Sequence, residues 1–417
     1  MKQNIKYRSK KLYTKPFNKQ KGNCSDADEI IKWLRKFGPT SRTDLAYAFD
    51  FSRAKITPLV SDLIRRGIIR EGGNIDTNEG RPPRLIRFKE DFGYAIGVDL
   101  GATSVDVGLA DFSGHIVACF GEPLVLCSSP EIILKRICEI INDLVEKEKI
   151  GKECIIAIGL GVPGPVDFST KLLVSPCGLP GWEVYPIQEY MKQQFPQAEI
   201  FIDNDANIMA FGELRAGIGK GVDNFIFLKV GTGIGAGIVC NGEIYQGSSG
   251  CSGDVGHICV DKEGPVCVCG NRGCLQSLAS GKAIAEKATH GALEGQSPLL
   301  SERISSKENK LTAEDVSVAA AAGDAFSNKL LQESGELIGE TLAGVVNVLN
   351  PSLLLIGGGV SNIGHQFLSS IRRAILRRSH PLSTRDLRIE YSSLGMKAGI
   401  IGAVSLALEL FQMERRD

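Results

Sequence analysis

The stretch that decides the fold is YAIGVDLGATSVDVGLADFSGHIVACF, residues 94–120. Its apolar and β-branched residues come in short runs, and glycine-containing turns at Gly101 and Gly114 separate them. The predicted strands are residues 94–99, 104–110 and 115–120. This stretch therefore predicts the start of a sheet whose strands are joined by tight turns.

Strands and helices alternate along the rest of the chain, which is typical of an α/β body. Strands are predicted at residues 155–159, 199–202, 225–230 and 353–356, and helices at residues 131–147 and 398–411. We expect a body of two lobes, at residues 91–200 and 201–417, with the last helix packing back on the first lobe.

Upstream of the body, residues 26–90 have a different pattern. Apolar residues at helical spacing predict three short helices, the first ending at Gly38 and the third running from Ser52 to Gly67. Two short strands, at residues 68–69 and 85–88, follow them. Three helices and such a ribbon make a winged helix-turn-helix, a DNA-binding fold. Pro58 within the third helix predicts a kink.

The charge of the chain is divided unevenly. The net formal charge is zero, but residues 1–90 hold 21 Lys and Arg against 10 Asp and Glu, which leaves 27 basic and 38 acidic residues elsewhere. A basic head on an acidic body is expected when only the head meets phosphates. Residues 1–25 hold 8 basic and no acidic residues, which predicts a flexible basic arm. The alternative to phosphate binding is that these basic residues form a solvated tail.

The third helix of the head is expected to enter the major groove, and the ribbon turn, residues 79–84, the minor groove. Arginines flank a stiff proline pair in that turn, and a narrow minor groove attracts arginine. The alternative is a protein-interaction module with a basic surface. The predicted DNA contacts are Arg42, Ser52, Arg53, Lys55, Thr57, Arg81 and Arg84.

Three glycine turns follow predicted strands, at residues 99–103, 231–237 and 357–359. Their backbone N–H groups can cradle phosphate oxygens, and Asp99 can hold a magnesium ion or its water. The second turn lacks the lysine of a Walker loop, which excludes that class. Each alone is consistent with a simple tight turn, but together they favour a nucleotide site. Its predicted residues are Asp99, Gly101, Thr103, Gly231, Thr232, Gly233, Gly358 and Gly359.

Polar residues 203–207, DNDAN, follow another predicted strand. A kinase of small hydroxyl compounds needs a carboxylate that takes the proton from the attacking hydroxyl. Asp205 is our candidate for this base, with Asn204 orienting the substrate. The same string would also satisfy a helix cap.

Three thiols lie within CVCGNRGC, residues 267–274, and His257 lies ten residues upstream. Three thiolates and one imidazole complete a tetrahedral zinc site with no open position for catalysis. We therefore predict a structural zinc ion. Its ligands are His257, Cys267, Cys269 and Cys274. Free thiols or a disulfide are the alternative.

The composition, 43% hydrophobic, suffices for full-sized cores, and no apolar run approaches the length of a membrane span. The N-terminal residues do not resemble a secretory signal. Most of the 12 cysteines stand singly in apolar surroundings, as expected in a reducing compartment. We expect a cytoplasmic protein with no membrane partner.

Together these motifs resemble the ROK family of repressors and sugar kinases, which implies a two-lobed actin-like (sugar-kinase/RNase H-like) ATPase fold. The most specific part is Gly256-His257 with the cysteine cluster. Residues 99–103, 161–167, 204–207 and 231–237 also match. The head, from Gly38 to Leu85, resembles that of the xylose-repressor branch.

The resemblance implies sugar contacts and makes Asp205 the catalytic base. The implied sugar-binding residues are Gly164, Asn204, Asp205, Asp254, His257 and Gln276. Family kinases have Glu in place of Asp254 and of Gln276. The shorter Asp changes the reach to a sugar hydroxyl, and Gln weakens a charge-assisted hydrogen bond. These departures disfavour efficient turnover.

The leading hypothesis is a transcriptional regulator, a repressor of carbohydrate-utilisation genes, whose body binds a sugar and shifts the DNA-binding equilibrium. The alternative is an ATP-dependent sugar kinase, similar to glucokinases or N-acetylhexosamine kinases, that uses ATP and Mg²⁺ and carries a DNA-binding head. A scaffold bound by a phosphotransfer protein has no sequence feature of its own. Because helix-turn-helix proteins usually pair on two half-sites of double-stranded DNA, we expect a homodimer or higher homo-oligomer.

Overall fold

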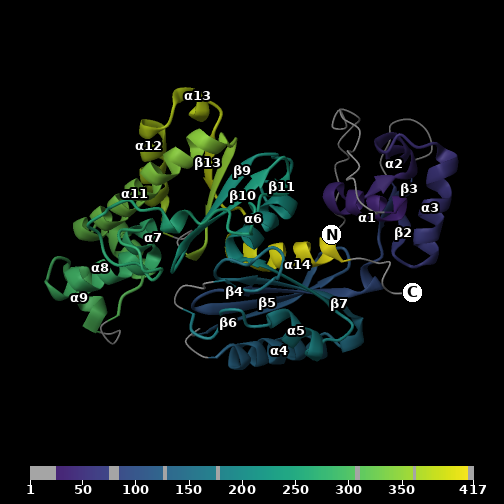
Figure 1. The fold of residues 1–417 in the computed structure, drawn as a ribbon, viewed down its shortest axis with the longest axis horizontal. Coiled ribbons are helices and arrows are strands. Elements are labelled where there is room, and N and C mark those ends of the chain that lie inside the picture. The colour runs from purple at the N-terminus through teal and green to yellow at the C-terminus, as the bar shows by residue number, and fades with distance from the viewer. Residues whose placement is uncertain are drawn as a thin grey trace.

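The computed structural model describes residues 25–74, 84–124, 129–174, 179–305, 310–359 and 363–411. In these ranges the chain forms a small head with a three-stranded sheet and a body with two five-stranded sheets (Figure 1). None of the helices in these ranges combines the length and apolarity of a bilayer span.

The head packs three helices against a small antiparallel sheet, in the order β1-β3-β2. Its elements are α1 (Asp26–Phe37), β1 (Thr40–Ser41), α2 (Arg42–Ala48), α3 (Arg53–Arg65), β2 (Ile69–Asn74) and β3 (Arg84–Phe88). Ser25 begins α1 with a capping box, and Ser52 caps α3. Helix α3 continues through Pro58, which lacks one hydrogen-bond donor near the start of the helix. The predicted wing turn lies outside the described residues, as do residues 1–24.

The two sheets of the body share one topology. The first has the order β6-β5-β4-β7-β8 and the second β11-β10-β9-β12-β13, so that in each the first strand in sequence is central. In each, the first three strands are antiparallel and the last two run parallel to the central strand. This repeated sheet is the two-lobed α/β fold expected from the sequence.

The first lobe contains β4 (Tyr94–Leu100), β5 (Ser104–Asp111), β6 (Ile116–Pro123), α4 (Pro130–Lys147), β7 (Ile155–Val162), α5 (Ile187–Gln194) and β8 (Glu199–Asn204). Strand β7 is buried along its whole length. Such a continuous apolar run is typical of a parallel strand covered on both faces.

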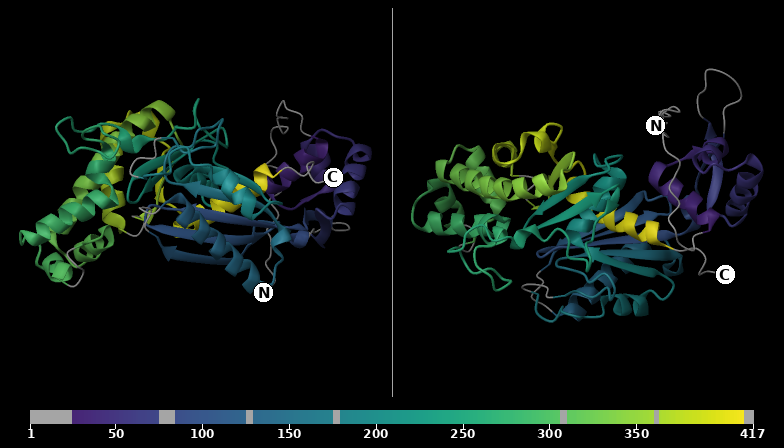
Figure 2. Two further views of the ribbon diagram at one scale, coloured as in Figure 1. Left: turned by 60° about the horizontal axis from the view of Figure 1, so that its bottom comes forward. Right: turned by 45° about the horizontal axis from the view of Figure 1, so that its top comes forward.

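The second lobe contains α6 (Asp205–Ala216), β9 (Phe225–Val230), β10 (Ile234–Cys240), β11 (Glu243–Ile244), α7 (Leu275–Ala279), α8 (Gly281–Leu293), α9 (Pro298–Ser305), α10 (Ala313–Ala321), α11 (Ala325–Leu349), β12 (Leu353–Gly357), α12 (His365–Arg378), α13 (Pro381–Thr384) and β13 (Arg388–Tyr391). Most of these helices gather at the end of the molecule opposite the head (Figure 2).

Helices α6 and α14 (Ala398–Leu410) pack against each other between the two sheets. Helix α14 contacts β4, β5 and β7, so the last helix lies on the sheet of the first lobe (Figure 1). Glycines make this close packing feasible: a Cβ on Gly402 would lie 1.8 Å from the Ile208 carbonyl oxygen, and one on Gly212 would lie 2.5 Å from the Ala398 carbonyl oxygen.

The head is attached to the body through one shared apolar cluster. Leu408 and Phe411, at the end of α14, belong to it together with head residues such as Ile30 and Phe88. Arg35 of α1 lies in this contact, donates to the Phe112 carbonyl oxygen and stacks on the Phe88 ring, 3.9 Å from its centroid. Burial lowers the pKa of Arg35 to about 9, although Glu409 and Asp111 oppose the shift. The contact therefore holds a buried cation.

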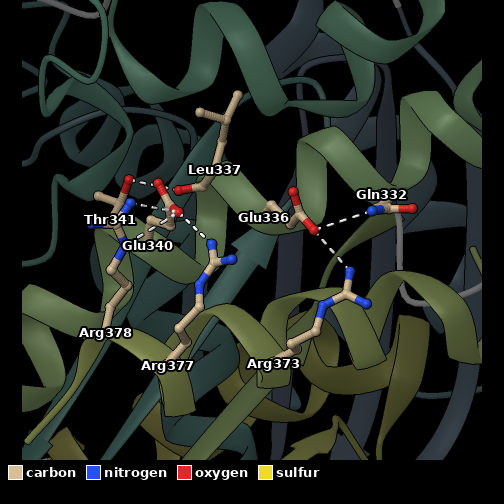
Figure 3. A network of polar contacts seen from close by, with 8 residues as sticks. All are labelled: Gln332, Glu336, Leu337, Glu340, Thr341, Arg373, Arg377 and Arg378. Atoms are coloured by element: carbon tan, nitrogen blue, oxygen red, sulfur yellow. Dashed lines mark hydrogen bonds and ion pairs between the residues drawn. The ribbon is translucent and has the colours of Figure 1, made fainter.

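Helices α11 and α12 are linked on the surface by ion pairs (Figure 3). Glu336 accepts from Arg373 at 2.8 Å, and Glu340 accepts from Arg377 at 2.8 Å and from Arg378 at 3.0 Å. The arginine side chains are more than half exposed.

We expect Glu340→Ala to lower the unfolding free energy by less than about 1 kcal/mol, because exposed ion pairs are screened and ordering long side chains costs entropy. Thermal unfolding of the variant measures this. The control is Glu333→Ala on the same helix, where the exposed carboxylate is 3.8 Å from Lys329. If Glu340→Ala lost several times more unfolding free energy than the control, the conclusion that these ion pairs add little stability would be wrong.

Candidate functional site

The predicted metal ligands come together. One ligand atom from each of His257, Cys267, Cys269 and Cys274 lies within 4.8 Å of the others. The Sγ atoms of Cys269 and Cys274 are 3.7 Å apart, and Cys267 Sγ is 3.5 Å from His257 Nδ1. Tetrahedral zinc with Zn–S bonds of about 2.3 Å separates sulfurs by roughly 3.8 Å. The residues therefore fit a four-coordinate metal ion.

Backbone turns bring these thiols together. The Gly270 N–H donates to the Cys267 carbonyl at 2.9 Å, and the Cys267 N–H donates to the Asn271 carbonyl at 2.7 Å. Gly270 and Gly273 adopt φ values of +88° and +64°, which favour glycine. A Cβ on Gly273 would also lie 1.4 Å from the Asp261 carbonyl oxygen, so only glycine fits.

The predicted metal ligands also adjoin part of the predicted sugar site, because His257 belongs to both. Its Nδ1 faces the thiols, while its Nε2 is 3.9 Å from Asp254 Oδ1 and 3.5 Å from Gln276 Nε2. Gln276 also donates to Cys267 Sγ at 3.5 Å. Three of the predicted sugar-binding residues thus form one group around this histidine.

The other three predicted sugar-binding residues form a second group. Asn204 caps α6, and its Oδ1 accepts from the Ala206 N–H at 2.9 Å. Its Nδ2 donates to the Gly164 carbonyl at 2.9 Å. Asp205 follows as the first residue of α6, where the helix dipole favours a carboxylate. The cap predicted as the alternative for this string is therefore present, and it fixes the Gly164 loop beside Asp205.

Both groups adjoin strand β10. The Ala236 N–H donates to the Gly253 carbonyl at 2.8 Å, next to Asp254. On the other side, a Cβ on Gly237 would lie 2.5 Å from the Ala206 carbonyl oxygen. The two groups therefore flank the same strand.

The prediction of a glycine loop over residues 231–237 was wrong in its length. Only Gly231–Gly233 form the turn, and β10 begins at Ile234. Gly237 serves close packing against α6, because a side chain there would meet Ala206 and Ala210. Helix packing and phosphate binding both select glycine, so the sequence pattern does not separate them.

Two of the three predicted glycine turns lie against each other. Gly359 lies against Gly231, since a Cβ on Gly231 would be 3.8 Å from the Gly359 nitrogen. Gly358, which lies between the end of β12 and Gly359, has a φ of +87°. In the first lobe, the Gly101 N–H donates to the Ser104 carbonyl at 2.8 Å, and the exposed Thr103 carbonyl accepts from Leu124 at 2.9 Å. Thr232 is exposed in the second-lobe turn.

Sequence reasoning missed Lys229, which donates a hydrogen bond to Asp205 Oδ2. The available signal was a lysine in the otherwise apolar strand FIFLKV. Burial acts to lower the pKa of Lys229, but Asp205 and then Asp99 raise it overall. Burial also raises the pKa of Asp99 to about 7, against the opposing effect of Lys229. Lys229 and Asp205 therefore form a buried ion pair, and Asp99 from the other lobe interacts electrostatically with Lys229.

The predicted DNA contacts differ in how they are held. Arg42 pairs with Glu71 at 2.8 Å, and Arg84 lies 3.7 Å from the same carboxylate. Lys55 pairs with Asp26 at 2.7 Å. Arg53 is exposed at the start of α3.

Two further predicted DNA contacts, Ser52 and Thr57, make local hydrogen bonds. The Ser52 hydroxyl accepts from the Lys55 N–H at 3.3 Å, and the Thr57 hydroxyl donates to the Arg53 carbonyl at 2.8 Å. Arg81 lies outside the described residues.

Comparisons with known proteins agree with this architecture. The model of the ROK family matches residues 95–410. A xylose repressor from Caldicellulosiruptor bescii is 30% identical over 91% of this chain and 94% of its own. A solved ROK-family transcriptional regulator, a homologue of the E. coli MLC protein, aligns with a TM-score of 0.76 at 26% identity, covering 92% and 96% of the two chains.

A glucokinase from Streptomyces griseus, solved with glucose and AMPPNP, aligns with a TM-score of 0.67 at 30% identity. It covers 76% of this chain and 99% of its own. The similarity to regulators thus extends over more of the chain than the similarity to this kinase.

Proposed function

Because this chain belongs to the ROK family, we propose that it is a sugar-responsive DNA-binding transcriptional regulator, a repressor of carbohydrate-utilisation genes. The observation that carries the proposal is the extent of the similarity: the xylose repressor aligns over 91% of the chain, whereas the glucokinase aligns over 76%. The head is the winged helix-turn-helix that reads the operator, and the body binds the sugar effector.

The cysteine cluster holds a structural zinc ion in this proposal. The separations of its sulfur and nitrogen atoms support zinc, because they suit tetrahedral thiolate and imidazole ligation. The ion leaves no position open for substrate. It fixes His257, whose Nε2 contacts Asp254 and Gln276, the other two predicted sugar-binding residues of this group.

Helices α6 and α14 supply a physical route from the sugar site to the head. Asp205 begins α6, and Gly399 near the start of α14 packs on Asp99, since a Cβ there would lie 1.8 Å from Asp99 Oδ2. At the far ends, Arg215 donates two hydrogen bonds of 2.6 Å to Glu409. We propose that sugar binding shifts this helix pair and so changes the position of the head.

The test uses the full chain and a duplex selected from a random pool. D-Xylose or D-glucose is expected to change the duplex affinity by at least about fivefold, the low end of ordinary coupling between sites. Fluorescence anisotropy measures it. No selectable duplex, or no response to any sugar in a panel, would overturn the proposal. The alternative, a sugar kinase with a DNA-binding head, predicts ATP consumption on the same panel.

Arg53→Ala is expected to weaken duplex binding about tenfold, because a side chain at the start of the recognition helix reaches base edges or phosphates. If Arg53 neutralises a phosphate, the slope of log affinity against log salt also becomes shallower by about one. The control is Arg385→Ala, an arginine of the body that is 69% exposed. Equal affinities for the two variants would contradict the assignment of α3 as the reading helix.

A further inference from the structure

Lys229 occupies an unusual place for a charged side chain. It lies on β9, the central strand of the second sheet, and its neighbours across the sheet are Gly235 and Gly357. Only 17% of its side chain is exposed. A buried ammonium group is costly unless it is paired. The two flanking glycines leave room beside the aliphatic part of the lysine side chain. The ammonium group at its end needs a partner.

Its partners are two carboxylates from different elements. The Lys229 Nζ donates to Asp205 Oδ2, and the Asp205 side chain is only 10% exposed. Asp99, at the end of β4 in the other lobe, acts electrostatically to raise the pKa of Lys229. Asp99 Oδ1 is buried and has no hydrogen-bond partner among the described residues. The ammonium therefore pairs with Asp205 and is also under the electrostatic influence of a buried carboxyl group from the other lobe.

A phosphoryl-transfer site needs both of these carboxylates for other purposes. The base must accept the hydroxyl proton, but one oxygen of Asp205 already accepts from Lys229. A divalent cation must approach acidic oxygens, but the positive charge that Lys229 holds against Asp205 repels it. The residues present do not fit a magnesium ion at this acidic pair.

We propose that Lys229 is a built-in cation that takes the place of a divalent metal beside Asp205 and makes this a sugar-binding site without phosphoryl transfer. The inference rests on the proposed function, since it explains how a kinase-like body acts as a sensor. Stability alone does not account for the lysine, because an apolar residue in a buried strand is usually at least as stabilising as a buried ion pair.

Binding of Mn²⁺, followed by electron paramagnetic resonance on zinc-loaded full chain, tests the proposal. Wild-type protein is expected to have no Mn²⁺ site that depends on Asp205, so Asp205→Asn leaves its binding isotherm unchanged. Lys229→Met is expected to bind Mn²⁺ at least about tenfold more tightly, because a neighbouring positive charge is removed. The double variant Lys229→Met/Asp205→Asn should lose that gain. The control Lys282→Met removes an exposed lysine of α8 and should change nothing.

Two results would overturn the proposal: Mn²⁺ binding in the wild type that Asp205→Asn weakens, or identical isotherms for the wild type and Lys229→Met. The comparison of the wild type with Asp205→Asn does not depend on whether Lys229→Met folds. Duplex binding and its sugar response are measured on the same preparations. The absence of duplex binding or of a sugar response would contradict the proposed regulatory function. The Mn²⁺ isotherms test the role of Lys229 separately.

Discussion

Cys269→Ser is expected to remove the metal ion, from about one zinc per chain to none, because three remaining ligands do not close a tetrahedral structural site. The loss extends to the sugar site. His257 and Gln276 are held beside the cluster by contacts of 3.5 Å to Cys267, so both side chains lose a fixed neighbour when the cluster loses its order. Elemental analysis measures the zinc, and thermal shift with D-xylose or D-glucose measures the sugar response.

Cys259→Ser is the matched control. Cys259 is exposed and lies opposite Cys274 in a β-bridge, but it does not belong to the ligand cluster. This variant should retain full zinc and its sugar response. Full zinc content in a Cys267, Cys269 and Cys274 triple serine variant would contradict the metal assignment.

Gly402→Ala is expected to cost about 3 kcal/mol of unfolding free energy, at the upper end of overpacking effects. The added methyl group would lie 1.8 Å from the Ile208 carbonyl oxygen, and backbone cannot give way as a side chain does. Helices α6 and α14 must therefore separate. Calorimetry should show a fall in Tm of roughly 4 °C for a body of this size.

Gly344→Ala makes the same chemical change in another helix, α11, where a Cβ would meet nothing within 4 Å. It should stabilise the protein by up to about 1 kcal/mol, because alanine is the better helix former.

In Gly402→Ala the duplex affinity should also respond less to sugar, since the helix pair links the site to the head. A Tm for Gly402→Ala equal to that of Gly344→Ala would contradict the close-packing argument.

The sequence by itself determined the parts of the fold that depend on local patterns. The strand at residues 225–230 and the helix at residues 398–411 were predicted to within one residue, because apolar period and capping residues act locally. The cysteine spacing likewise identified ligands that the structure brings within 4.8 Å. The resemblance of the motifs to the ROK family identified the family, which the family model then matched.

Only the tertiary structure decided what the remaining glycines and charges do. Gly237 was predicted as part of a phosphate-binding turn, but it is required by the close approach of α6, and Gly402 is required by the same helix. Lys229 is 24 residues from Asp205, and no local pattern predicts that they pair. Such contacts depend on how two sheets and two helices pack, because interior space and burial are properties of the assembled fold. Local sequence therefore determined the elements and the metal ligands, and packing decided which charges share one buried site.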